Sequence, residues 1–125
     1  MTKGLRNKMK LEQLKEILQA KVLCCGDHLD REIEMVCGSD LMSDVLAFIK
    51  ADSLLLTGLT NPQVVRTAEM AEITAVCFVR GKQPHAETIK LAEARKMPLL
   101  TTGLSMFESC GRLYREGLHS CDETK

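Results

Sequence analysis

Aromatic side chains are scarce in this chain of 125 residues, which has one tyrosine, three phenylalanines and no tryptophan. Proteins that bind single-stranded nucleic acid stack bases on aromatic rings, so the shortage argues against such a surface. Net charge is missing too, because 17 lysines and arginines balance 17 aspartates and glutamates. A balanced chain has no general attraction for nucleic acid or for an anionic membrane, and we expect neither as a partner.

Long apolar runs are also missing. The chain has no stretch of about 18 apolar residues, which is the length that a membrane-spanning helix needs. Its first residues are basic but are not followed by the apolar segment of a secretion signal. We therefore expect a cytoplasmic protein.

Six cysteines are present, but none forms a C-x-x-C pair and no histidine lies at zinc-finger spacing from them. Four of the six lie in apolar runs typical of strands, so we interpret them as small buried hydrophobic residues of a reducing compartment. We expect no metal and no cofactor. The cysteines are Cys24, Cys25, Cys37, Cys77, Cys110 and Cys121.

The common catalytic motifs are absent as well: the phosphate loop, the dinucleotide fingerprint, the nucleophile elbow and the zinc helix. The segment Gly81-Lys82-Gln83 resembles the end of a phosphate loop but lacks its hydroxyl residue and its first glycine. The run Asp27-His28-Leu29-Asp30 offers an imidazole between two carboxylates, which we interpret as a polar turn. With no nucleophile, base and orienting group together, we expect a protein that is not an enzyme.

The chain does contain a regular alternation of apolar strand patterns and amphipathic helix patterns, which predicts βαβ units. We predict an α/β fold of three layers, α/β/α, with a mainly parallel sheet. A single domain is expected at 11–118, between a flexible basic N-terminus at 1–10 and a mobile tail at 119–125. The predicted strands are 22–25, 33–37, 53–57, 75–79 and 98–101, and the later helices begin near Leu41, Pro62, Pro84 and Met106.

Local signals fix several helix ends. Asn61 followed by Pro62 predicts a capped helix start, and Ser105 with Glu108 matches a capping box. Asp40 is expected to cap the helix that follows it, which begins near Leu41. In the last helix, a single apolar stripe is predicted to be buried: Phe107, Gly111, Tyr114 and Leu118.

Parallel sheets bind ligands at the carboxyl ends of their strands, so the loops there form the candidate site. Their glycines and hydroxyls, with two cations, could hold a phosphate or carboxylate. Turn and cap chemistry accounts for the same residues without a ligand, and both interpretations stay open. The candidates are Gly58, Thr60, Asn61, Arg80, Lys82, Thr102 and Ser105.

Several short segments, in order, give the chain a family resemblance. Asp30-Arg31-Glu32-Ile33, Ser39 to Val45, Thr57 to Pro62 and Pro98 to Thr101 resemble the DRTGG domain family, over roughly Leu11 to Leu118. Glu34-Met35-Val36 stand where the family would have Thr-Gly-Gly. The resemblance implies a fold like the N-terminal domain of HPr kinase/phosphorylase, without its catalytic half. It also implies a role in assembly or regulation, as in related modules that accompany CBS domains in pyrophosphatases.

We therefore expect a non-catalytic regulatory or assembly module that forms a homodimer and binds another protein. Interface candidates are the apolar residues that one small domain leaves uncovered, such as Met42, Leu46 and Met70. The alternative is a sensor that binds a nucleotide or other phosphate compound at the strand ends, where Lys82 would matter. A phosphotransferase acting alone is a third reading, but the residues that it needs to position metal and phosphate are not evident.

Overall fold

The computed structural model describes residues 8–121. Within this range, six strands form one sheet in the order β2-β7-β6-β5-β4-β8, and β1 pairs with β3 in a separate two-stranded ribbon. In the large sheet β2 runs antiparallel to β7, and the other pairs are parallel. The strands are β1 (Met9–Lys10), β2 (Lys21–Cys24), β3 (Glu32–Ile33), β4 (Met35–Gly38), β5 (Ser53–Thr57), β6 (Ala75–Phe78), β7 (Leu99–Thr101) and β8 (His119–Ser120).

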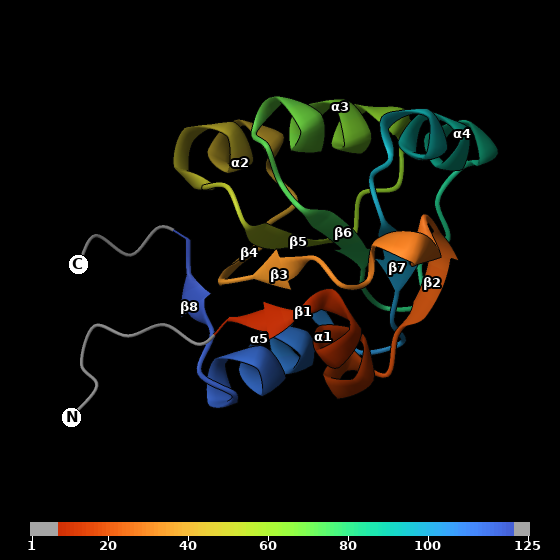
Figure 1. Cartoon of the computed structure of the whole chain (residues 1–125). Coiled ribbons are helices and arrows are strands. Elements are labelled where there is room, and N and C mark those ends of the chain that lie inside the picture. Colours follow the sequence, from red (N-terminus) through yellow and green to blue (C-terminus); the bar gives the residue numbers. More distant parts are fainter. Residues whose placement is uncertain (1–7, 122–125) are drawn as a thin grey trace.

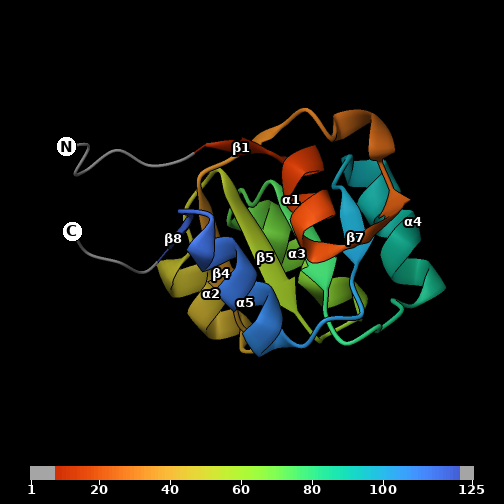
Figure 2. The ribbon, with the colours of Figure 1, turned by 90° about the horizontal axis from the view of Figure 1, so that it is seen from below.

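Helices cover both faces of the large sheet. Figure 1 shows α2, α3 and α4 in a layer above the strands and α1 and α5 in a layer below them, and Figure 2 shows α1 and α5 from below. This is the predicted three-layer α/β fold with a mainly parallel sheet. The helices are α1 (Leu11–Leu18), α2 (Met42–Phe48), α3 (Pro62–Met70), α4 (Ala86–Arg95) and α5 (Met106–Arg115), and a 3-10 turn spans Gly26–His28.

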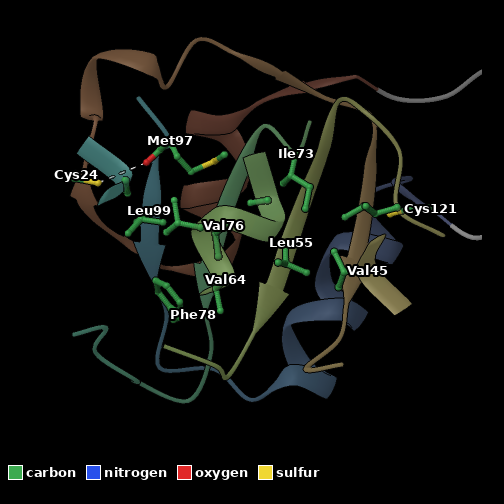
Figure 3. Close-up of a cluster of buried hydrophobic side chains, with 14 of the residues drawn as sticks. Cys24, Val45, Leu55, Val64, Ile73, Val76, Phe78, Met97, Leu99 and Cys121 are labelled. Carbon is green, nitrogen blue, oxygen red and sulfur yellow. Dashed lines mark hydrogen bonds between the residues drawn. The ribbon is translucent and has the colours of Figure 1, made fainter. Parts of the chain in front are cut away.

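The central strands are buried on both faces, which explains their continuous apolar sequence. In β5, Leu55 points into the core beneath α2 and α3, whereas Leu54 and Leu56 point into the core shared with α1 and α5. Figure 3 shows the upper core, in which Val76 and Phe78 of β6 lie among apolar side chains from neighbouring elements. The alternation of side chains along each strand therefore supplies two separate cores from one sheet.

The predicted caps of α3 and α5 are present. The Asn61 side chain accepts a hydrogen bond from the backbone N–H of Gln63 at 3.0 Å, and Pro62 is the first residue of α3. The Ser105 hydroxyl accepts one from the backbone N–H of Glu108 at 3.1 Å. Each cap satisfies a backbone donor that the first turn of a helix leaves free.

Strand pairing extends further toward both ends of the chain than the sequence predicts. Met9–Lys10, expected to be flexible, pair with β3 as strand β1. His119–Ser120, expected in a mobile tail, add β8 to the edge of the sheet beside β4, and the next residue, Cys121, is 1% exposed. The rest of the two predicted flexible segments, 1–7 and 122–125, lies outside the described residues.

The predicted buried stripe of α5 is wrong at three of its four positions. Phe107 is 88% exposed, Tyr114 is 70% exposed and Gly111 faces outward, so only Leu118, beyond the helix, is buried. The helix instead buries Ser109 and Leu113 against the sheet. The helix has a second, shorter apolar side at Met106, Cys110 and Leu113, and this side packs in the lower core.

Candidate functional site

The carboxyl ends of β4, β5, β6 and β7 lie along one edge of the sheet, as parallel strands require. Neighbouring strands β6 and β7 lead to helices on opposite faces, since α4 lies above the sheet and α5 below it (Figure 1). In α/β proteins a crevice opens where adjacent strands diverge in this way. The loops that follow β5, β6 and β7 carry the seven predicted site residues.

Hydrogen bonds within the chain join the two loops that follow β6 and β7. The loop after β6 and the loop after β7 are joined by three hydrogen bonds, each 2.8 Å long. These bonds use backbone groups that a ligand in the crevice would otherwise contact. They run from Arg80 N–H to the Leu104 carbonyl, from Gly81 N–H to the Thr102 carbonyl, and from the Thr101 hydroxyl to the Lys82 carbonyl.

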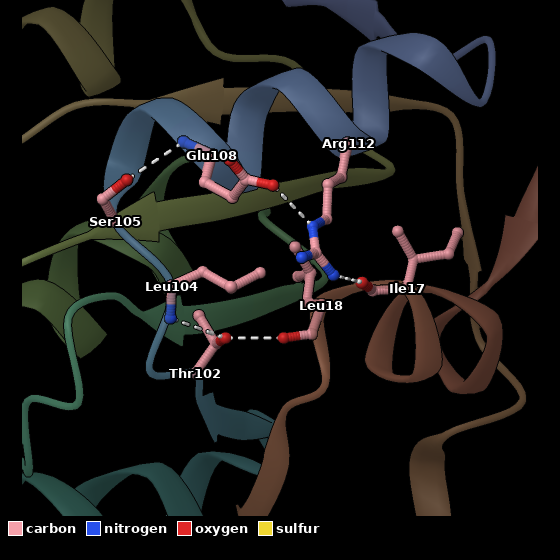
Figure 4. Close-up of polar contacts among 7 residues, drawn as sticks. All are labelled: Ile17, Leu18, Thr102, Leu104, Ser105, Glu108 and Arg112. Atoms are coloured by element: carbon pink, nitrogen blue, oxygen red, sulfur yellow. Dashed lines mark hydrogen bonds and ion pairs between the residues drawn. The ribbon is translucent and has the colours of Figure 1, made fainter.

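Thr102 connects this edge to the helix layer below. Its hydroxyl is buried and donates to the carbonyl of Leu18 at 2.6 Å, and it also accepts from the N–H of Leu104 at 3.2 Å (Figure 4). Nearby, Arg112 of α5 donates to the Ile17 carbonyl and to the Glu108 carboxylate. Thr102 therefore holds α1 to the β7–α5 loop, which is a structural task.

Asp40 occupies the position where an anion would meet the β5–α3 loop. Its Oδ1 accepts from the N–H of Gly58 at 2.7 Å and from the hydroxyl of Thr57 at 2.9 Å. The prediction that Asp40 caps α2 is wrong, because the cap position is Leu41 and has no side-chain cap bond. A carboxylate already bound to Gly58 disfavours a second anion there by charge repulsion.

Thr60 also forms hydrogen bonds within the fold, through its backbone carbonyl. Its carbonyl accepts from the hydroxyl of Thr88 at 2.8 Å and from the N–H of His85 at 3.3 Å, which ties the β5–α3 loop to the start of α4. Asn61 and Ser105 are the helix caps described above. The structure thus gives five of the seven candidates a place in the hydrogen bonding of the fold.

Arg80 and Lys82 are the exceptions. Both side chains are exposed, and within the described part of the chain neither forms an ion pair or side-chain hydrogen bond. Arg80 adopts a left-handed backbone conformation with φ of 62°, which turns the chain tightly between β6 and Gly81. These two cations remain free to meet an anion at the strand ends.

Two cysteines at the β4–β8 edge form a pair that the sequence analysis did not bring together. Val36 lies opposite Ser120, so Cys37 and Cys121 follow on adjacent strands, and both line a cavity of about 190 Å³. Hydrogen bonding to Cys37, then to Ser53, lowers the pKa of Cys121 to about 7. All six cysteines are free thiols, and no group of three potential ligands among residues 8–121 is placed to hold a metal ion.

An apolar groove lies beside the exposed face of α5. It has a volume of about 440 Å³ and is bounded by α5, by β4 and the edge strand β8, and by Leu118. Phe107 and Tyr114 stand at its rim. The sequence signal for this surface is the apolar stripe of α5, which the periodicity alone places in the core.

The family model of the DRTGG domain matches residues 13–115. This chain belongs to the DRTGG domain family. A search of curated protein sequences finds no match to it.

A solved structure with a similar fold also contains this type of domain. It is described as the CBS and DRTGG domains of the regulatory region of Clostridium perfringens pyrophosphatase, complexed with its activator diadenosine tetraphosphate. The TM-score is 0.70 with 15% sequence identity, over 93% of this chain and 50% of that one. At this identity the likeness shows a shared fold, and the present DRTGG domain spans half the length of the solved chain.

The Asp-Arg of the family motif lies at the opposite edge of the sheet from the predicted site. Arg31 donates to the carbonyl of Thr74, just before β6, and lines a cavity of about 550 Å³. Acids and bases share this cavity, and Glu69 of α3 is paired with Arg95 of α4 across it at 3.3 Å. Such a mixed lining has no preference for an anion, so the motif arginine acts here as a link between the loop before β3 and the sheet.

Proposed function

We propose that this DRTGG domain is a non-catalytic regulatory and assembly module that self-associates and binds another protein. The observation that carries the proposal is the placement of its aromatic side chains. Of four aromatic residues only Phe78 is buried, whereas Phe48, Phe107 and Tyr114 are exposed. Large exposed apolar groups are typical of surfaces that meet another protein.

The strand-end chemistry supports a role without catalysis. Hydroxyls and amides that an enzyme would direct at a substrate are bound to the fold's own backbone, as at Thr102, Asn61 and Ser105. The free thiols fit the reducing cytoplasm, where we propose that the domain works.

Native mass spectrometry tests the proposal, on protein isolated gently from its own cells and on purified protein at rising concentration. A dimer mass for the purified chain, with no consumption of added nucleoside triphosphate, is expected. A monomer at every concentration, with no second protein attached in the cellular preparation, would contradict the proposal. Steady nucleotide turnover would replace it with an enzymatic function.

A second candidate is a sensor for a phosphate compound at the strand ends. It is favoured by the unpaired cations Arg80 and Lys82, and the similar solved structure is described as complexed with diadenosine tetraphosphate. Titration with that compound by calorimetry tests it, with Lys82→Ala as the site variant and Lys90→Ala, an exposed lysine of α4, as the matched control. Binding that only Lys82→Ala weakens would support the sensor, and equal binding by all three proteins would exclude this site.

A further inference from the structure

The outward face of α5 has the character of an interface. Phe107 and Tyr114 are seven residues apart, so they lie on the same side of the helix, with Gly111 between them. A Cβ added at Gly111 would meet no heavy atom within 4 Å, which leaves room for another backbone to approach closely. The apolar groove beside them, lined by Val36, Cys110 and Leu118 among others, has a volume of about 440 Å³, which is larger than a side chain.

We propose that a second copy of this chain docks on α5, with the two α5 helices antiparallel and the two-fold axis beside Gly111. The proposal rests on the self-association proposed above and names the surface that forms it. A two-fold axis makes each copy supply the same patch, so the patch must complement itself. The aromatic side chains and the charges of α5 both meet that condition.

The aromatic residues complement each other about the axis. Phe107 lies four residues before Gly111 and Tyr114 lies three residues after it, so antiparallel pairing places Phe107 of each copy beside Tyr114 of the other. Each ring can then enter the groove of the opposite copy, where Leu118 and Cys110 are partly or fully covered already. The glycine at the crossing point allows the helices to come near enough for these contacts.

The charges specify the antiparallel direction. Glu108 in the first turn of α5 and Arg115 in the last turn are also seven residues apart and lie on one flank of the aromatic stripe. In an antiparallel pair each Glu108 lies near Arg115 of the other copy, whereas a parallel pair leaves these two residues at opposite ends of the contact. Antiparallel helix dipoles favour the same arrangement.

The size of the contact predicts a reversible dimer. With ten residues, α5 is about 15 Å long, so two such helices with their grooves bury an area at the low end for specific interfaces. We therefore expect association that depends on concentration, with monomer and dimer in exchange.

The first test changes the aromatic anchor. Phe107→Glu is expected to raise the dimer dissociation constant by about a hundredfold or more, because both copies lose a buried ring. Met70→Glu tests the rival surface, since Met70 is one of the interface candidates from the sequence and is 68% exposed on α3, in the opposite helix layer. If α5 forms the dimer, this substitution leaves the constant unchanged. Sedimentation over a concentration series measures both, and circular dichroism confirms that each variant is folded.

The second test exchanges charges between copies. Glu108→Arg alone and Arg115→Glu alone each place like charges across the axis and should weaken the dimer. An equimolar mixture of the two variants should form a heterodimer, since every cross-axis contact then joins an acid to a base. Loss of the intrachain bond from Arg112 to Glu108, 2.9 Å long, affects one variant only and cannot produce recovery on mixing.

The outcomes separate this surface from the proposed function. If the wild-type chain dimerises and Phe107→Glu dimerises equally well, the α5 interface is overturned while self-association stands. The same holds if the mixture of the two charge variants forms no heterodimer. A wild-type chain that stays monomeric at every concentration would overturn both. Loss of the dimer in Phe107→Glu with recovery in the charge mixture would establish the antiparallel interface.

Discussion

Asp40 shows how a single carboxylate can join two loops. Its Oδ1 receives both the Gly58 N–H and the Thr57 hydroxyl, so it connects the loop after β4 to the loop after β5. Hydrogen bonds to a charged acceptor are stronger than neutral ones. Asp40 is exposed to solvent, which reduces the contribution of each hydrogen bond to the free energy of unfolding.

We predict that Asp40→Ala lowers the free energy of unfolding by about 1–2 kcal/mol, because the two donors lose their acceptor. Asp40→Asn keeps an acceptor oxygen and should lose clearly less. Urea denaturation followed by circular dichroism compares the two variants. Equal losses would mean that the charge, rather than the acceptor, holds the loops.

The pKa of Cys121 is lower in the folded chain than in the unfolded chain, so this residue makes stability depend on pH. Its pKa is lowered to about 7 in the fold, from the ordinary value of 9.0, whereas burial raises the pKa of Cys77 to about 12. Between pH 7 and pH 9, Cys121 is therefore a thiolate in the folded chain and a protonated thiol in the unfolded chain. The stabilisation from Cys121 is therefore complete above pH 9 and is lost as the pH falls through 7.

We predict that raising the pH from 7 to 9 stabilises the wild-type chain relative to Cys121→Ala by an amount on the order of 1–3 kcal/mol. Cys77→Ala should keep the wild-type slope in this range, since Cys77 is protonated throughout it. Chemical denaturation at a series of pH values measures the slopes. A Cys121→Ala chain with the wild-type slope would show that another group titrates there.

At the scale of the element, α5 presents two faces with opposite roles. Leu113 is 1% exposed and belongs to the lower core, whereas Phe107 points away from it. The helix is fixed in this orientation by the Ser105 cap and by Arg112, which reaches the Ile17 carbonyl of α1 (Figure 4).

Leu113→Ala is predicted to lower the free energy of unfolding by about 2–5 kcal/mol, because it leaves a cavity in the core. Phe107→Ala should change it by less than about 0.5 kcal/mol when measured at a concentration low enough for the monomer. Thermal unfolding of the two variants provides the comparison. A large loss in Phe107→Ala at low concentration would place that ring inside the monomer's core.

At the scale of the whole molecule, β8 closes one edge of the sheet. Its two residues pair with β4, and Cys121 is buried in the upper core cluster that Figure 3 shows. The chain thus returns from β7 at one side of the sheet, through α5, to the far edge beside β4.

A chain ending at Leu118 is predicted to be less stable by about 2 kcal/mol, because it loses the β8 pairing and the burial of Cys121. A chain ending at Cys121 retains both and should match the 125-residue chain. Melting temperatures of the three chains decide the point. If the shorter chain melted with the others, β8 would contribute nothing to the fold.

Particular residues show how far sequence reasoning reaches. The strand Ser53–Thr57 and the cap at Asn61 were predicted correctly, because a buried apolar run and a helix start each depend on neighbouring residues alone. The α5 stripe failed because periodicity identifies an amphipathic helix but does not say which of two apolar sides meets the sheet. The ligand site at Gly58 and Lys82 stays a prediction. It could not be judged from the sequence, because Asp40 and the hydrogen bonds between the β6 and β7 loops occupy backbone groups there.

The sequence by itself determined the alternation of the central strands and helices, the mainly parallel sheet with covered faces, and the family to which the chain belongs. These follow from local patterns that the chain carries wherever it folds. Only the tertiary structure decided that Phe107 and Tyr114 are exposed, that Cys37 lies beside Cys121, and that Asp40 joins two loops. Such relations join residues far apart in the chain, and they arise only once the sheet order and the helix layers set which surfaces meet.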